Sequence, residues 1–273
     1  MKVILSLHNA NLLGKAASDD FCDAYCHYLH DNGIEWHGFY TNDEMRKRLK
    51  DRYSQILTKY ESPNFGTTWN KLSNVVLAID LENEPMVGDS NMENDFGDWI
   101  CDMATHLKDT CGLSGIAVST GGTRGADWGD APPATVRQNW PNDVFECKAV
   151  DIIAFHGYYP DNGEAWLNLF SGEELNGVLR PKALKYNKLV MVEEWSYTRG
   201  EDDNFANQKA DIKTHGQALN LRGIPWLYWD VRTKDDEYCD TDGCTEVSVD
   251  GSSPWPVLSS VMKQASNSIT EFD

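Results

Sequence analysis

The stretch Val75-Val76-Leu77-Ala78-Ile79-Asp80-Leu81-Glu82-Asn83-Glu84-Pro85 decides how this 273-residue chain is interpreted. A short, nearly continuous apolar run that ends in polar residues and a proline is typical of a strand buried on both faces, as in a parallel sheet. In parallel α/β folds the chemistry lies at the carboxyl ends of the strands. The sequence therefore makes Glu82-Asn83-Glu84 a candidate site.

Five further segments repeat this pattern. Short apolar runs at residues 2–8, 115–120, 151–157, 188–194 and 224–230 each precede a polar or glycine-bearing loop, and helical patterns lie between strands at residues 42–60, 95–110, 173–185 and 205–221. Strands that alternate with helices predict an α/β fold, here a TIM-type (β/α) barrel of about six βα units. No repeat or linker interrupts the pattern, so we expect one barrel domain over residues 1–273.

Polar side chains gather at the predicted strand ends. They occur in His8-Asn9, Glu82-Asn83-Glu84, Thr120-Gly121-Gly122, His156-Gly157-Tyr158, Glu193-Glu194-Trp195 and Trp229-Asp230. Cleavage of a glycosidic bond with retention needs two carboxyl groups about 5–5.5 Å apart, one protonated and one ionised. Glu84 and Glu194, each at the end of a strand, are the two residues that the sequence offers for this chemistry.

In these motifs the sequence resembles family 5 glycoside hydrolases of clan A. Leu81-Glu82-Asn83-Glu84-Pro85 is similar to the family's Asn-Glu-Pro signature, whose glutamate is the acid/base, and Val192-Glu193-Glu194-Trp195 is similar to its nucleophile motif. His156-Gly157-Tyr158 and Trp229 resemble its His-x-Tyr motif and its platform tryptophan. The resemblance implies a retaining β-glycosidase with Glu84 as acid/base and Glu194 as nucleophile, which requires no metal or organic cofactor.

Within the family, the endo-β-1,4-mannanases look nearest. Phe39-Tyr40-Thr41-Asn42 precedes Asn-Glu-Pro much as in their long strand-three loop, and residues 151–160 resemble their strand-six segment, although Met86 replaces an arginine that is frequent there. We therefore expect endo-acting hydrolysis of a β-1,4-linked polysaccharide, with mannan first. The alternatives are a β-glucanase or cellulase of the same mechanism and a carbohydrate-binding pseudoenzyme.

The resemblance and the chemistry together assign roles around the two glutamates. We expect Asn83 to hold the sugar 2-hydroxyl, Tyr158 to donate a hydrogen bond to Glu194, and His156 to orient the acid/base region. Core packing stays open as the alternative for His156 and Tyr158. Glu193 stays open as the alternative nucleophile, although side chains alternate along a strand and only one of the two glutamates should point into the barrel mouth.

Further residues are expected to contact the sugar itself. Aromatic rings stack on the apolar faces of sugars, which favours Trp229 and, after it, Trp195 as substrate-binding residues. His8 and Asn9 are expected to line the floor of a subsite. For both of these residues, and for any single tryptophan other than Trp229, core packing is the alternative.

The resemblance implies that this sequence lacks two βα units that family members carry before the histidine-bearing strand, because we expect that strand at residues 2–8. The missing second strand supplies an arginine that braces the nucleophile in the family, and Arg124 or Arg199 are candidates to replace it. An open sheet would expose edges and apolar surface. A fragment, a naturally shortened barrel and a dimer whose partner chain covers the open edge all stay open, and we favour the shortened barrel.

Charge restricts the partners of this chain. Forty-three acidic and 24 basic residues give a formal net charge of −19. Such a field repels phosphate backbones and anionic headgroups, so we expect no nucleic-acid or membrane partner, whereas a neutral polysaccharide or oligosaccharide is not repelled. No apolar run reaches the about 18 residues of a membrane helix, and the first residues fit a strand better than a signal peptide.

Seven cysteines favour an oxidising compartment and hence a secreted protein. We expect a disulfide between Cys239 and Cys244, which flank Asp240-Thr241-Asp242-Gly243, with a calcium loop as the alternative reading of that turn. Cys101 and Cys111 form a second candidate pair, and Cys22 and Cys26 are expected to bridge to other segments. The odd total implies a thiol without a partner in the chain.

Overall fold

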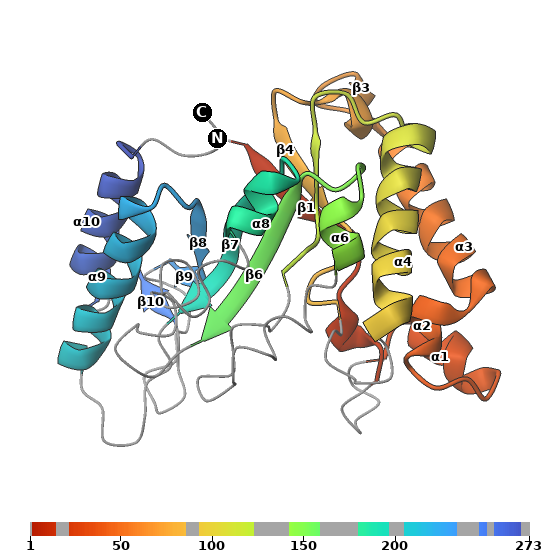
Figure 1. Cartoon of the computed structure of the whole chain (residues 1–273), viewed down its shortest axis with the longest axis horizontal. Helices are drawn as coiled ribbons and strands as arrows, with labels where there is room; N and C mark the ends of the chain where they lie inside the picture. Colours follow the sequence, from red (N-terminus) through yellow and green to blue (C-terminus); the bar gives the residue numbers. More distant parts are fainter. Residues whose placement is uncertain are drawn as a thin grey trace. The chain divides into compact units, whose positions relative to one another are not determined.

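The computed structural model describes residues 2–14, 22–85, 93–122, 142–158, 180–196, 205–233, 246–249 and 254–268. They belong to two compact units, each treated by itself below (Figure 1). Unit 1 comprises Met1–Thr123 and Arg137–Ile153, and unit 2 comprises Arg124–Val136 and Ala154–Asp273.

Unit 1 is built on parallel strands. β4 (Val76–Asp80) lies between β1 (Val3–Ser6) and β5 (Ala117–Ser119), and β5 pairs on its other side with the first residue of β6 (Ile152–Tyr158). β4 is paired on both edges, and its side chains are largely buried, as the apolar run predicts. The carboxyl ends of β1, β4 and β5 therefore lie side by side.

Helices of unit 1 surround a core rich in aromatic side chains, which includes Phe39, Tyr40, Tyr53 and Trp99. Side-chain caps begin two of these helices: Asp23 accepts from the first N–H groups of α1, and Asn42 does the same for α3. The elements are α1 (Ala24–Asp31), α2 (Gly38–Thr41), α3 (Asp43–Ser54), α4 (Glu93–Thr105) and α6 (Asn142–Glu146), the π-helical turns η3 (Gln55–Lys59) and η5 (His106–Thr110), the 3-10 turns η1 (Ala10–Leu12) and η4 (Trp69–Lys71), and the hairpin β2 (Glu61–Ser62) with β3 (Thr67–Thr68).

Unit 2 continues the parallel pattern in the order β6-β7-β8. Its helices α9 and α10 pack side by side, and Ile212 and Leu258 from them join Val247 in one buried cluster (Figure 1). The elements are β7 (Leu189–Ser196), β8 (Trp226–Tyr228), the parallel pair β9 (Val231–Arg232) and β10 (Val247–Ser248), and the helices α8 (Arg180–Lys185), α9 (Phe205–Leu221) and α10 (Trp255–Ala265).

All six predicted strands are present, and the fold class is confirmed as a parallel α/β fold. The helical pattern at 205–221 is α9, while the patterns at 42–60 and 95–110 correspond to α3 with η3 and α4 with η5. Of the pattern at 173–185, only the part that forms α8 is described. The sequence interpretation missed α1, α2, α6 and α10. None of the helices in the described ranges has the length and apolar character needed to span a membrane.

The cysteine pairing corrects two expectations. Cys101 bonds Cys147 rather than Cys111, because α4 packs against α6, whereas about ten helical residues place Cys111 roughly 15 Å from Cys101. Cys22 and Cys26 bond each other, since one helical turn separates them. Among the described cysteines, Cys111 is free and buried, as the odd count implies. Cys239, Cys244 and the turn between them lie outside the described residues.

We expect Gly216→Ala to destabilise unit 2. A Cβ at Gly216 in α9 would lie 2.3 Å from Cγ1 of Val261 in α10 and 3.7 Å from Trp195. The resulting clash should cost about 1–3 kcal/mol, more than the roughly 1 kcal/mol that alanine gains over glycine in a helix. Urea unfolding of the single variants and of Gly216→Ala/Val261→Ala measures the coupling. Additive effects of the two substitutions would contradict this packing.

Candidate active site

The predicted residues of unit 1 meet where β1 and β4 end. The segments that follow β1 and β4 remain hydrogen-bonded to each other. The Asn83 N–H donates to the His8 carbonyl at 2.9 Å, and the Ala10 N–H donates to the Asn83 carbonyl at 3.0 Å. Asn9 lies opposite Asn83 in an isolated parallel bridge. His8, Asn9, Asn83 and Glu84 are thus brought together, as the strand-end argument predicts.

The imidazole of His8 lies beneath this loop. Its Nδ1 lies 2.5 Å from Oε1 of Glu82, and its Nε2 lies 3.1 Å from Oδ2 of Asp23. The other carboxyl oxygen of Glu82 accepts a 2.8 Å hydrogen bond from the Tyr40 hydroxyl. His8 is only 5% exposed, and both its ring nitrogens are engaged within unit 1. Its side chain therefore supports the loop and has no free nitrogen for a sugar hydroxyl, unlike the expected subsite floor.

The two carboxylates keep His8 protonated. Burial lowers the pKa of His8, but the hydrogen bonds and charges of Asp23 and Glu82 outweigh it and raise that pKa to about 9. Burial also raises the pKa of Asp23, yet the His8 ring and the N–H groups of Cys26 and Tyr25 hold it below its usual value. Complete burial raises the pKa of Glu82, and its bonds to His8 and Tyr40 oppose that rise.

Glu84 is held in a strained conformation. Its φ is +49°, a region that costs a residue with a Cβ about 1–2 kcal/mol, and it is 8% exposed. Its N–H donates to the carbonyl of Gly121 at 3.0 Å, and its Oε2 accepts a 2.7 Å hydrogen bond from the Asn11 amide. Only a glycine at position 121 allows its backbone to come this close to residues 82–84, because a Cβ there would lie 1.7 Å from the Glu82 carbonyl oxygen. Strain of this kind is common at functional residues.

Asn11 was not among the predicted site residues, nor were Asp23, Tyr40 and Gly121. The polar run His8-Asn9-Ala10-Asn11 directly after a strand is the signal that would have pointed to Asn11. Gly121 lies in the strand-end motif Thr120-Gly121-Gly122 and Tyr40 in Phe39-Tyr40-Thr41-Asn42, but neither motif indicates a contact with this site, and no local pattern indicates Asp23.

In unit 2, Glu194 near the end of β7 meets an imidazole from β6. Its Oε2 lies 3.5 Å from Nδ1 of His156, and His156 is 1% exposed. Burial does not distinguish Glu194 from Glu193, because the Glu193 residue is 9% exposed and the Glu194 side chain 13%. The contact with His156 is the observation that supports Glu194. Tyr158 closes β6, but its side chain is outside the description, as are Met86, Arg124 and Arg199.

The two predicted tryptophans of unit 2 have different surroundings. Trp195 is completely buried and packs edge-on against Trp226 and Tyr228, with ring centroids 5.4 and 5.2 Å away. It therefore has no open face for a sugar, and core packing was the correct reading. Trp229 is 51% exposed, and its N–H donates to the Trp195 carbonyl at 3.0 Å. Trp229 thus keeps an open ring while its backbone is fixed.

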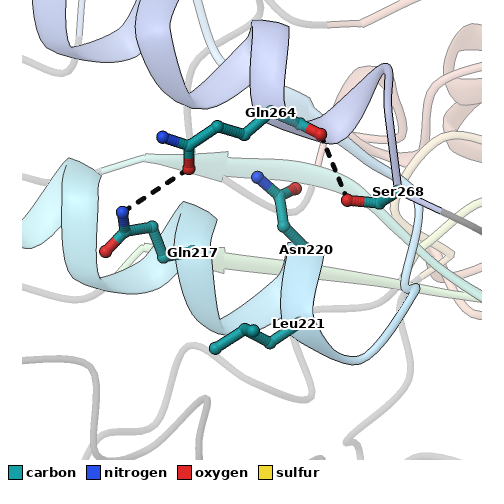
Figure 2. A pocket seen from close by; sticks show the side chains of 5 residues that line it. All are labelled: Gln217, Asn220, Leu221, Gln264 and Ser268. Atoms are coloured by element: carbon teal, nitrogen blue, oxygen red, sulfur yellow. Dashed lines mark hydrogen bonds between the residues drawn. The ribbon is translucent and has the colours of Figure 1, made fainter.

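A surface hollow of about 350 Å³ between α9 and α10 lies at the other end of unit 2 (Figure 2). It adjoins the amino end of β8, where Asn220 accepts a 2.8 Å hydrogen bond from the Trp226 indole, whereas Glu194 is near the carboxyl end of β7. The hollow is therefore separate from the candidate active site. Its lining residues are Gln217, Asn220, Leu221, Gln264 and Ser268.

We expect the stability of the protein to fall as pH rises through the pKa of His8. A pKa raised from 6.5 to about 9 stabilises the folded state fully below pH 6.5, and that stabilisation is lost as pH rises through 9. The difference amounts to on the order of 3 kcal/mol. Urea unfolding at pH 6 and at pH 10 measures it.

His8→Gln should be less stable than the wild type at pH 6 and should lose most of this pH dependence. His37→Gln is the matched control, because the His37 side chain is 42% exposed. A wild-type stability that stays constant between the two pH values would refute the buried imidazolium.

Comparison with protein-family models and with curated sequences finds no match. Solved structures do match. The chain is similar to the endo-β-1,4-mannanase of Thermotoga petrophila (TM-score 0.73, 18% identity, covering 97% of this chain and 58% of that one). It is also similar to the endo-1,4-β-mannanase of Rhizomucor miehei (TM-score 0.70, 17% identity, covering 98% of this chain and 71% of that one). A third similar structure is an endo-β-1,4-glucanase variant from Xanthomonas axonopodis pv. citri (TM-score 0.54, 13% identity, covering 98% of this chain and 74% of that one). At these identities the likeness shows the fold, and the chain therefore has the (β/α)-barrel-type fold of these glycoside hydrolases while spanning only part of their length.

Proposed function

We propose that this chain is a retaining β-glycosidase that cleaves internal β-1,4 linkages of mannan, with Glu84 as acid/base and Glu194 as nucleophile. The observation that carries the proposal is the placement of both glutamates at carboxyl ends of parallel strands, in a fold shared with endo-β-1,4-mannanases. Each glutamate also has a polar partner, Asn11 for Glu84 and His156 for Glu194.

The mechanism is a double displacement. The Glu194 carboxylate attacks the anomeric carbon while Glu84 gives its proton to the glycosidic oxygen, so that the leaving sugar departs as an alcohol. The Glu84 carboxylate then takes a proton from water, whose oxygen attacks the same carbon and releases Glu194. The proposal requires the two carboxyl groups to lie about 5–5.5 Å apart.

Several residues would bind the sugar or position the glutamates. Asn83 would hold the 2-hydroxyl of the sugar with its side-chain amide. Its backbone N–H and carbonyl are both hydrogen-bonded, which fixes the position of the residue. Trp229 would stack on a sugar face with its exposed ring. Asn9 would line the floor, and Tyr158 would donate to Glu194. His8 would act through Glu82, as a positioning residue that does not touch the substrate.

Asn11 fits the changing proton state of Glu84. An acid/base carboxyl must alternate between its protonated and ionised forms, and a side-chain amide can donate to the ionised form and accept from the protonated one. The 2.7 Å bond from Asn11 therefore holds Glu84 without requiring either state.

A β-glucanase of the same mechanism is the second candidate, favoured by the likeness to the endo-β-1,4-glucanase variant. The active residues would be the same, and only the sugar contacts would differ. The two disulfides of the described residues suit an oxidising compartment, so we propose that the enzyme is secreted.

We expect Glu194→Gln to abolish sugar release from mannan and carboxymethyl-cellulose, because an amide cannot form the glycosyl-enzyme. Glu193→Gln is the matched control and should retain activity. A fluorosugar should label Glu194 covalently in the wild type. Equal activity of the wild type and Glu194→Gln would remove the nucleophile assignment, whereas oligosaccharide binding without turnover or labelling would indicate a pseudoenzyme.

Glu84→Gln should lower polysaccharide hydrolysis about 10²–10⁴-fold, the usual contribution of general acid–base catalysis. An aryl glycoside with a good leaving group needs little protonation, so its first step should survive and release a burst of phenol. A variant without that burst, or one with unchanged polysaccharide hydrolysis, would contradict the acid/base role.

The pH profile of kcat/KM should be bell-shaped with an acidic optimum. One carboxyl must be protonated and the other ionised, so the rate falls when either changes state. A flat profile between pH 4 and pH 9 would rule out the carboxyl pair.

A further inference from the structure

The start of α1 gathers four side chains that are good ligands for a soft or borderline metal ion. Cys22 directly precedes the capping residue Asp23, Cys26 and His30 lie one turn apart on α1, and His27 follows Cys26. Nothing in the proposed glycosidase mechanism uses these residues. Thiolate sulfur and imidazole nitrogen are the ligands that Zn²⁺ prefers in structural sites.

The possible ligand atoms lie close together around the Cys22–Cys26 disulfide. Sγ of Cys22 lies 3.6 Å from Nδ1 of His27, and Sγ of Cys26 lies 4.0 Å from Nε2 of His30. The ligand atoms of Cys22, Cys26 and His30 all lie within 4.8 Å of one another. Zn–S bonds of about 2.3 Å and Zn–N bonds of about 2.0–2.1 Å, at tetrahedral angles, place sulfur and nitrogen about 3.6 Å apart. The sulfur-to-nitrogen distances are therefore close to those of a zinc site, whereas the two sulfurs, which are bonded to each other in this structure, must move to about 3.8 Å apart after reduction.

The space beside these ligands is kept open by a glycine. A Cβ at Gly14, whose φ is +70°, would lie 2.7 Å from Sγ of Cys26 and 3.6 Å from Nε2 of His30. Asp23 is not an alternative ligand, because its carboxylate already accepts from two N–H groups of α1 and contacts His8. His27 and His30 are exposed and Cys22 is partly exposed, whereas Cys26 is buried, so an ion from solvent would enter from the side of the histidines.

We propose that the reduced form of this chain binds one Zn²⁺ through Cys22, Cys26 and His30, with His27 as the fourth ligand, and that the Cys22–Cys26 disulfide is the metal-free, oxidised form. A dithiol reductant supplies two electrons and two protons to the disulfide and itself becomes a disulfide. The two thiols then lose their protons as Zn²⁺ binds both sulfurs. Oxidation reverses these steps and releases the ion.

Titration of the full-length protein with Co²⁺, a spectroscopic substitute for Zn²⁺, tests this site. After anaerobic treatment with dithiothreitol and its removal, one equivalent should produce the visible absorption of tetrahedral thiolate-bound cobalt, and Zn²⁺ should abolish it. The protein with the disulfide intact should show no such bands. Absence of the bands in the reduced wild type, or equal bands in the oxidised protein, would overturn the proposal.

Variants assign the ligands. Cys22→Ser, Cys26→Ser and His30→Gln should each lose the bands, and His30→Gln changes an exposed side chain while leaving both cysteines in place. Cys111→Ser and Cys239→Ser/Cys244→Ser are the matched controls and should keep them. Loss of the bands in a control, or their retention in His30→Gln, would place the ion elsewhere. Unchanged bands and affinity in His27→Ala would exclude the fourth ligand. Glycosidase activity enters none of these measurements, so the two proposals fail independently.

Discussion

Unit 1 depends on a buried imidazolium held between two carboxylates. His8 contacts Glu82 through one ring nitrogen and Asp23 through the other, while Tyr40 satisfies the second oxygen of Glu82. Uncompensated charges at this depth would cost several kcal/mol each, so no member can be removed without leaving its partners unpaired. The contacts join the end of β1, the beginning of α1 and the loop after β4. The position of Asn83 and Glu84 is therefore linked to residues from other elements of unit 1.

The two candidate catalytic carboxyls have different partners, in keeping with their proposed tasks. Glu84 receives a hydrogen bond from a neutral amide and keeps a strained backbone, which the absent side chain of Gly121 makes room for. Glu194 lies beside an imidazole from the neighbouring strand. An acid/base must exchange protons, and an amide can form a hydrogen bond with either form of its carboxyl group.

Helix α1 contributes to two features of unit 1. Its capping residue, Asp23, holds His8, and the cysteines and histidines around that cap form the proposed zinc site. Reduction or oxidation of Cys22 and Cys26 therefore takes place next to the residue that anchors the charge network. The proposed zinc site nevertheless rests on its own four side chains and does not require that the chain be a glycosidase.

The sequence by itself determined the strand pattern, helix α9 and the strand-end location of Glu84 and Glu194. Apolar runs and helical spacing are local properties of the chain. A short, nearly continuous apolar strand is typical of a parallel sheet that is covered on both faces. The sequence also indicated Glu84 as a candidate catalytic residue, because Asn83 and Pro85 flank it in a motif that resembles a known family. These conclusions required no knowledge of which elements touch.

Only the tertiary structure decided which distant residues meet. In the folded chain Cys147 is bonded to Cys101, and Trp195 is buried against Trp226 and Tyr228. His8, which we expected to contact the sugar, contacts Glu82 instead. The left-handed backbone of Glu84 and its bond to Asn11 likewise follow from the approach of Gly121 and η1. The physical reason is the same in each case, because burial and hydrogen bonding depend on neighbours that packing brings together, and local periodicity does not encode those neighbours.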